Sequence, residues 1–577
     1  MASFQTALPK SYDPHWTEMA FSSGRGRDAL GIETHGELIL THLLPGINNQ
    51  TSRARYYSFW AWCLRDFIED PNAGHTRQGF YEWMRPREDM LILAFLAHGH
   101  ESGIAGTEAG KKAWDKGEKE SYSLTWPSMR TVKGGAYERY YRGPLAEMNI
   151  ILPEGEDRRH DALAKPAGLA LADAYAEAVA DTLYVRNYLH ATQVTREIIE
   201  DFAEKGCLCQ ASRHEKERRA LIDAFFRFDI PDAAAIRRLA SLSFFLDIIH
   251  QSRGRPLHND AFRDVLYFWS YGASHPYHPQ GNLLEPAQGW RLFQLRQWFV
   301  FAVEALWSYF LRRIEIEPLS EEAYLSELLD RIDLAALGAD LGLILPATDP
   351  QALTLTDFYR AVRDAMPAAG GETGPVNFQN ALNERTLGDA IRDKHNRSDP
   401  QIMVGNGLVM LAMMYWRAGH WVDQPGWELL TTRHASGRLP MDSYIGHVEH
   451  AMSENWSLAQ WIIWLHQRYL WRQHRRVVLQ KLAGGGKDTS RFEIIDVPEQ
   501  EDLRFPKLRA IEQDDPKMNA PRFPSALQIM QDLALIEASP DQGYRLLPEG
   551  EALLEKFRHY QIPTSQSEPR DETAEGD

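Results

Sequence analysis

The sequence predicts a mainly α-helical, multi-domain protein with a small C-terminal winged-helix module of mixed α and β structure. The chain has 577 residues, which is longer than a single hydrophobic core normally supports. From residue 166 onward, apolar side chains recur at intervals of three and four residues over long segments, and this is the period of an α-helix. Near the C-terminus the pattern changes to a short helix, two short apolar runs and a final helix.

The composition favours well-packed cores and excludes a disordered scaffold, because 44% of the residues are hydrophobic and 17 are tryptophan. The formal net charge of −17 argues against a protein that coats nucleic acid through bulk positive charge, although a local basic groove remains open. The N-terminus lacks a secretion signal, and charged side chains interrupt the apolar residues 292–311. We therefore expect a cytoplasmic protein without a membrane segment.

The first region, residues 1–160, is expected to be mixed and mostly helical. Its most informative stretch is residues 43–64, LLPGINNQTSRARYYSFWAWCL, where Thr51 or Ser52 is expected to cap an aromatic helix. Arg53 and Arg55 then fall in the first turn, at the positive end of the helix dipole, where a cation is unfavourable. We therefore expect a phosphate or a carboxylate to bind there. Residues two apart on a helix point in different directions. We expect one arginine to point outward and the other toward a buried acid.

A central helical domain is predicted over residues 161–366. Its expected helices cover residues 169–190, 218–228, 233–251, 260–271 and 289–314. Apolar residues surround most of the circumference at 239–249 and 293–310, which is typical of central helices. Residues 367–375 are predicted to be a linker, and residues 376–485 a second helical region with helices at 405–416 and 453–482.

The C-terminal residues 486–560 resemble a winged-helix domain. A β-like stretch at 490–497 is followed by a helix at 523–533, a hairpin around 540–543 and a helix from Pro548 to Phe557. The supposed reading helix has no Lys or Arg, and only Arg522 precedes it, so DNA binding is expected to be weak or to use the wing. The acidic residues 561–577 are expected to be disordered.

A basic stripe follows the helix predicted at residues 453–482. Arg468, Arg472, Arg475, Arg476 and Lys481 are its main members, and Lys487 and Arg491 extend it past the single acid Asp488. Such a stripe can bind the phosphates of a nucleic acid without recognising its base sequence. It can equally dock onto acids elsewhere in this chain or in a partner, and the sequence leaves both interpretations open.

Motifs for known chemistries are missing or incomplete. The segment LAGGGKD fails as a phosphate-binding loop, because Lys481 stands where the first glycine is required and Asp488 follows the lysine. Cys207 and Cys209 are interpreted as ordinary thiols at a helix end, and no histidine group has a full ligand set. The three groups considered are Glu33, His35, Glu37 and His42; Asp247, His250 and His258; and His447, Glu449 and His450. We therefore expect no metal and no cofactor, and we assign no catalytic residue.

The stretch LLPGINNQTSRARYY, residues 43–57, resembles the start of uncharacterised bacterial proteins encoded in antiphage defence islands. The resemblance implies a cytosolic component of a bacterial defence or mobile-element system. Our leading hypothesis is a noncatalytic subunit of such a multiprotein system, which binds other subunits or DNA through the basic stripe, Arg53, Arg55 and Arg522. The alternatives are a metal-dependent nuclease built from distant acids such as Asp247 and Glu384, and a pure assembly adaptor.

Overall fold

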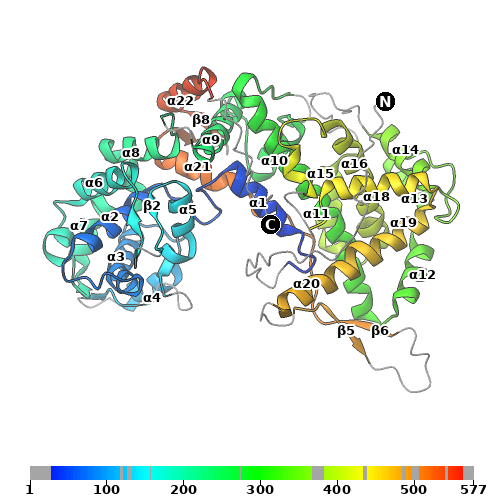
Figure 1. The fold of residues 1–577 in the computed structure, drawn as a ribbon, viewed down its shortest axis with the longest axis horizontal. Helices are drawn as coiled ribbons and strands as arrows, with labels where there is room; N and C mark the ends of the chain where they lie inside the picture. The colour runs from blue at the N-terminus through cyan, green and yellow to red at the C-terminus, as the bar shows by residue number, and fades with distance from the viewer. Residues whose placement is uncertain are drawn as a thin grey trace, which may run out of the picture.

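The computed structural model describes residues 28–116, 121–126, 133–155, 158–229, 232–272, 275–366, 382–432, 438–483, 489–495, 506–539 and 543–562. Helices dominate these residues, and the strands among them form two-stranded antiparallel sheets. The predicted mainly α class is thus confirmed. Figure 1 shows one group of helices around α2 (Arg55–Glu69) and a larger group around α11 (Leu284–Ile316), with α9 (Ala233–Ser252) and α21 (Phe523–Asp532) between them. The predicted linker, residues 367–375, and all but two residues of the predicted tail lie outside the described residues.

The first group of helices is built on the aromatic face of α2. Tyr56, Phe59, Trp60, Cys63 and Phe67 are all buried, as the sequence predicts for a core helix. The helix begins after Ala54, which has no capping side chain. The predicted cap is therefore wrong. The Thr51 hydroxyl is used earlier, since it accepts a hydrogen bond of 2.9 Å from the backbone N–H of Asn48 and so closes the turn before the helix.

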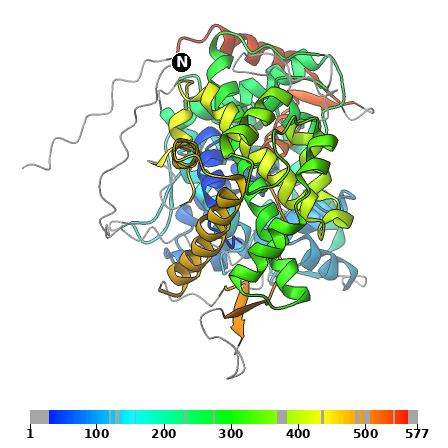
Figure 2. The same cartoon turned by 90° about the vertical axis from the view of Figure 1, so that its right-hand side faces the viewer.

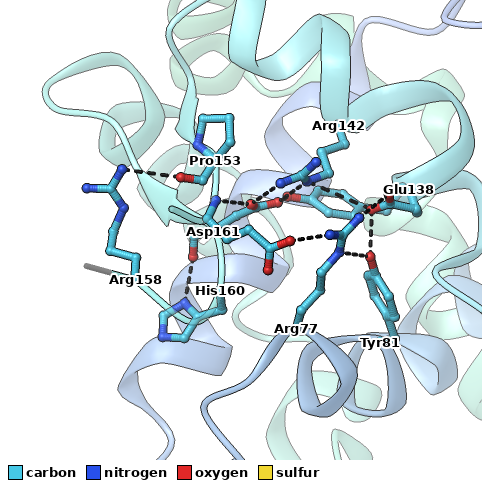
Figure 3. Close-up of polar contacts among 10 residues, drawn as sticks. Arg77, Tyr81, Glu138, Arg142, Pro153, Arg158, His160 and Asp161 are labelled. Atoms are coloured by element: carbon cyan, nitrogen blue, oxygen red, sulfur yellow. Dashed lines mark hydrogen bonds and ion pairs between the residues drawn. The ribbon is translucent and has the colours of Figure 1, made fainter. Parts of the chain in front are cut away.

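This group does not end at residue 160. Helix α2 packs against α6 (Ala167–Val179), and α3 (Arg77–Ala97) packs against α7 (Arg196–Gly206). Figure 3 shows the buried Asp161 carboxylate receiving bonds of 2.8 and 2.9 Å from Arg142, beside the pair of Arg77 with Glu138. The predicted boundary between 160 and 161 is corrected on this ground, because the residues before and after it share one core.

Helix α11 is the centre of the second group. It is buried along most of its length, as predicted, and it packs against α1 (Glu33–Leu43), α9, α10 (Asn259–Phe268) and α16 (Asn406–Trp421). None of the described helices is long and apolar enough to cross a bilayer. Helix α16 belongs to the second predicted helical region. Its contact with α11 therefore places that region against a helix of the central region.

Two predicted helices contain irregular turns. The helix predicted at 169–190 becomes α6 and a π-helical segment η2 (Tyr184–Tyr188), because the Thr182 hydroxyl bonds the Val179 carbonyl at 2.8 Å where α6 ends. The helix predicted at 453–482 becomes α19 (Leu458–Leu465), the π-helical η8 (His466–Trp471) and α20 (Arg472–Ala483). Figure 2 shows α20 in gold at the outer side of the second group.

The order of elements at the C-terminus is the predicted one. Helix α21 is followed by the hairpin of β7 (Ile536–Ala538) and β8 (Tyr544–Leu546), and then by α22 (Pro548–Arg558). These elements are not a separate body, because α22 packs against α9 and Phe523 of α21 stacks on Phe262 of α10 at 4.4 Å. The β-like stretch forms β5 (Phe492–Ile495), which pairs with β6 (Lys507–Ala510).

Eighteen further elements lie among the described residues. They are α4 (Thr107–Lys116), β1 (Tyr122–Ser123), η1 (Tyr137–Tyr141), α5 (Arg142–Glu147), β2 (Ile151–Leu152), β3 (Ala162–Leu163), β4 (Gln193–Val194), η3 (Leu208–Arg213), α8 (Glu215–Phe225), η4 (Gly281–Leu283), α12 (Glu321–Arg331), α13 (Leu334–Leu341), α14 (Leu355–Ala365), α15 (Glu384–Arg392), η5 (Lys394–Asn396), η6 (Gln401–Gly405), η7 (Trp427–Leu430) and α18 (Met441–Ser453).

Candidate functional site

Four arginines at the start of α20 form what we call the α20 patch: Arg438, Arg468, Arg472 and Arg476. Arg472 and Arg476 are exposed on α20, Arg468 is half-buried on η8, and Arg438 lies in the turn before α18. Burial lowers the pKa of Arg476, and the charges of the other three arginines lower it further. None of the four has an ion-pair partner in the part of the chain that the structure describes. Among the described residues, the patch therefore carries positive charge that no ion pair compensates.

The helix behind the patch is held by its apolar side. Trp461, Leu465, Tyr469 and Trp471 are buried, as the sequence predicts for most of this face. The π-helical η8 contains Tyr469 and Trp471 and leads directly into α20, and π-helical turns are frequent at functional sites. The buried His466 in this turn is 2.8 Å from the carbonyl of Ile462, which fixes its ring. The side of η8 and α19 opposite the arginines is thus packed into the core.

Other members of the predicted stripe have partners within the chain. Arg475 forms an ion pair with Glu321 of α12, and Lys481 donates to the Asp28 carbonyl at 3.1 Å. Arg491 is buried immediately before β5 and pairs with Asp514 at 2.9 Å. Lys487 and Asp488 lie outside the described residues. Arg475 and Arg491 thus dock onto internal acids, whereas Arg468, Arg472 and Arg476 have no ion-pair partner among the described residues.

Arg53 and Arg55 both bind acids of this chain. The fully buried Arg55 holds both oxygens of Glu217 on α8, with N–O distances of 3.0 and 2.8 Å, and donates to the Cys207 carbonyl at 2.7 Å. Arg53 donates to Asp532 of α21 at 2.9 Å. The expectation of one outward arginine is therefore wrong. The two side chains do diverge, as predicted, but each meets a buried carboxylate from a different helix. Arg55 is therefore closed to an external phosphate, and Arg53 is largely buried against Asp532.

Arg522 and the supposed reading helix are also occupied. Arg522 donates to Thr41 at 2.8 Å and to the Ile47 carbonyl at 3.2 Å, and it pairs with Glu37. Seven of the ten residues of α21 are buried, and the three half-buried ones, Pro524, Gln528 and Gln531, share one narrow face. A reading helix must present one face to the DNA groove. The narrow half-buried face of α21 carries no Lys or Arg, and Arg522 bonds to other groups of this chain.

The acids named for a nuclease are engaged in two separate hydrogen-bond networks. Asp247 accepts bonds from Tyr277 at 2.7 Å and from Arg558 at 2.7 Å. Glu384 accepts a bond from Tyr267 at 2.9 Å and pairs with Arg417. Both carboxylates are fully buried. Neither belongs to a group of metal-ligating side chains among the residues that the structure describes.

A group of four side chains that the sequence analysis missed lies in the first group of helices. Donor atoms of His98, His100, Cys207 and Cys209, which we call the Cys/His cluster, lie within 4.8 Å of one another. The histidines follow α3, Cys207 lies between α7 and η3, and Cys209 lies in the first turn of η3. In each pair one residue separates the two possible ligands, as His-x-His and as Cys-x-Cys. This short spacing is the signal that the sequence offered. The two pairs are far apart along the chain, so the cysteine pair was interpreted alone as ordinary thiols.

Comparisons with known proteins give no match, whether with family models, with curated proteins or with solved structures.

Proposed function

We propose that this protein is a noncatalytic binding subunit of a bacterial multiprotein system and that its α20 patch holds the phosphates of a nucleic acid. The observation that carries the proposal is the grouping of four arginines without an acid partner among the described residues. The resemblance of residues 43–57 to proteins of antiphage defence islands supports a role in such a system. The C-terminal helix, hairpin and helix would then be a winged-helix unit that serves packing, with DNA reading left to other surfaces.

Electrostatics support a polyanion as the ligand. The chain as a whole carries a net charge of −17, so general attraction to nucleic acid is absent and binding must be local. Each arginine in the α20 patch raises the electrostatic free energy of the others, and a phosphate chain relieves this repulsion at several points at once. Arginine also forms paired hydrogen bonds to phosphate. A single small anion would relieve only part of the repulsion.

Fluorescence anisotropy with labelled single-stranded and double-stranded DNA, and with RNA, tests the proposal. Arg472→Gln combined with Arg476→Gln is expected to weaken binding about tenfold or more at low salt. The same change is expected to reduce the slope of log affinity against log salt by about one to two, since each phosphate contact on duplex DNA contributes about 0.9.

Lys216→Gln combined with Arg219→Gln is the matched control. Both side chains are exposed on α8. The double substitution removes the same number of positive charges as the patch variant, but from the other group of helices. The proposal fails if the full-length protein binds no nucleic acid at low salt. It also fails if the control variant weakens binding as much as the patch variant.

An assembly adaptor is the second candidate, and one observation favours it. Leu479 and Leu482 are 65% and 44% exposed on α20, the helix that carries Arg472 and Arg476. Exposed apolar side chains beside arginines are typical of protein interfaces. A stoichiometric protein partner that is lost in Leu479→Ser, together with no nucleic-acid binding, would favour the adaptor over the proposed function.

A further inference from the structure

We propose that His98, His100, Cys207 and Cys209 bind a single zinc ion with all four side chains. The donor set of two imidazoles and two thiols is one that zinc prefers, and four protein ligands complete its tetrahedral shell. The inference is independent of the α20 patch, which lies in the other group of helices. It assigns a ligand to the Cys/His cluster, for which the sequence analysis expected no metal.

The distances fit a tetrahedral site. The Sγ atoms of Cys207 and Cys209 are 3.4 Å apart, and Nδ1 of His98 is also 3.4 Å from Sγ of Cys209. With zinc to sulfur at about 2.3 Å and zinc to nitrogen at about 2.0 Å, the edges of an ideal tetrahedron are about 3.8 Å between sulfurs and about 3.5 Å between sulfur and nitrogen. These two edges differ from the ideal values by a few tenths of an ångström at most, and every other pair of donors lies within 4.8 Å.

The surroundings of the histidines fit the same assignment. Nε2 of His100 is buried without a hydrogen-bond partner, and its ring stacks on Phe95 at 4.3 Å between centroids. A buried polar atom without a partner is costly unless a ligand satisfies it. Nε2 of His98 lies 4.0 Å from a carboxylate oxygen of Glu204, while its Nδ1 faces Cys209. Imidazoles that bind metal commonly direct their second nitrogen toward such a carboxylate.

The position of the cluster indicates a structural role for the metal. It joins the C-terminal end of α3 to the turn between α7 and η3, which are more than 100 residues apart in sequence. The same turn is held from the other side by Arg55, which donates to the carbonyls of Lys205 and Cys207. The Arg53 guanidinium lies 5.7 Å from the centre of the Phe95 ring, and this ring in turn stacks on His100. A four-ligand zinc would therefore fix the turn on which the start of α2 rests.

The zinc content of the full-length protein, purified without chelators, tests this proposal. Plasma mass spectrometry is expected to give about one zinc per chain for the wild-type protein. Cys207→Ser combined with Cys209→Ser, and separately His100→Ala, are expected to lose it. Cys63→Ser and His559→Ala are the matched controls, because Cys63 lies within α2 and His559 is exposed after α22. Both controls are expected to keep the metal.

A measurement on the wild-type protein covers the case in which the variants fail to fold. Modification of the thiols with a mercurial reagent is expected to release one equivalent of zinc, detected with a chelating dye. Replacement by Co²⁺ is expected to give the absorption of thiolate bound to tetrahedral cobalt. The proposal is overturned if the wild-type protein contains no zinc and takes up neither zinc nor cobalt. It is also overturned if the double cysteine variant retains the metal, or if Cys207 and Cys209 form a disulfide in the freshly purified protein.

Discussion

Replacing Glu217 by alanine is expected to lower the free energy of unfolding by about 3–5 kcal/mol, because it leaves the charge of Arg55 buried without a counter-ion. Both side chains of this pair are fully buried. Glu217 also accepts a hydrogen bond of 2.6 Å from the Ser58 hydroxyl, so the substitution leaves a second buried donor without its acceptor. Urea unfolding followed by circular dichroism measures the change.

Two controls separate loss of the pair from loss of a charge. Lys216 precedes Glu217 on α8 and forms an exposed ion pair with Glu177. Lys216→Ala removes this pair, and little or no change in the free energy of unfolding is expected. Arg55→Met combined with Glu217→Leu replaces both charges with apolar side chains, and it is expected to recover much of the lost stability. If Glu217→Ala costs less than about 1 kcal/mol, the pair does not hold α2 to α8 as we infer.

Periodicity predicted the long helices well because their apolar faces are buried in this same chain. Helix α9 agrees with the predicted residues 233–251 to within one position, and helix α11 agrees with 289–314 to within five. The division into domains failed for a different reason. Packing of α6 on α2 and the bonds of Asp161 join residues that are distant along the chain, and no local pattern marks them.

The candidate sites show the same limit. The sequence identified the arginines at 53, 55, 468, 472 and 476, but their roles depend on which acids lie opposite them. Glu217 and Asp532 are more than 150 and 450 residues from the arginines that they bind, so an intramolecular pair could not be told from an external anion. The Cys/His cluster was missed on the same ground. A short spacing within each half is visible in the sequence, whereas the approach of the two halves depends on the packing of α3 on α7.

The stability of the first group of helices is expected to fall with rising pH because of Asp89. This carboxyl is fully buried on α3, and burial, together with the neighbouring Glu88, raises its pKa to about 9. In the unfolded chain the carboxyl loses its proton near pH 4. Between these two values the folded state binds more protons than the unfolded state. Each unit of rising pH in this interval therefore costs up to about 1.4 kcal/mol of stability.

Asp89→Asn removes this titration and keeps the shape of the side chain. The stability of the variant relative to wild type is expected to increase as the pH rises from 4, with a gain of up to about 4 kcal/mol at pH 7. Urea unfolding at a series of pH values measures the difference. Glu82→Gln is the matched control, because it removes one negative charge from an exposed position of the same helix. A difference between Asp89→Asn and wild type that stays constant with pH would show that Asp89 is ionised in the folded protein, and that its burial is offset by a cation or by solvent.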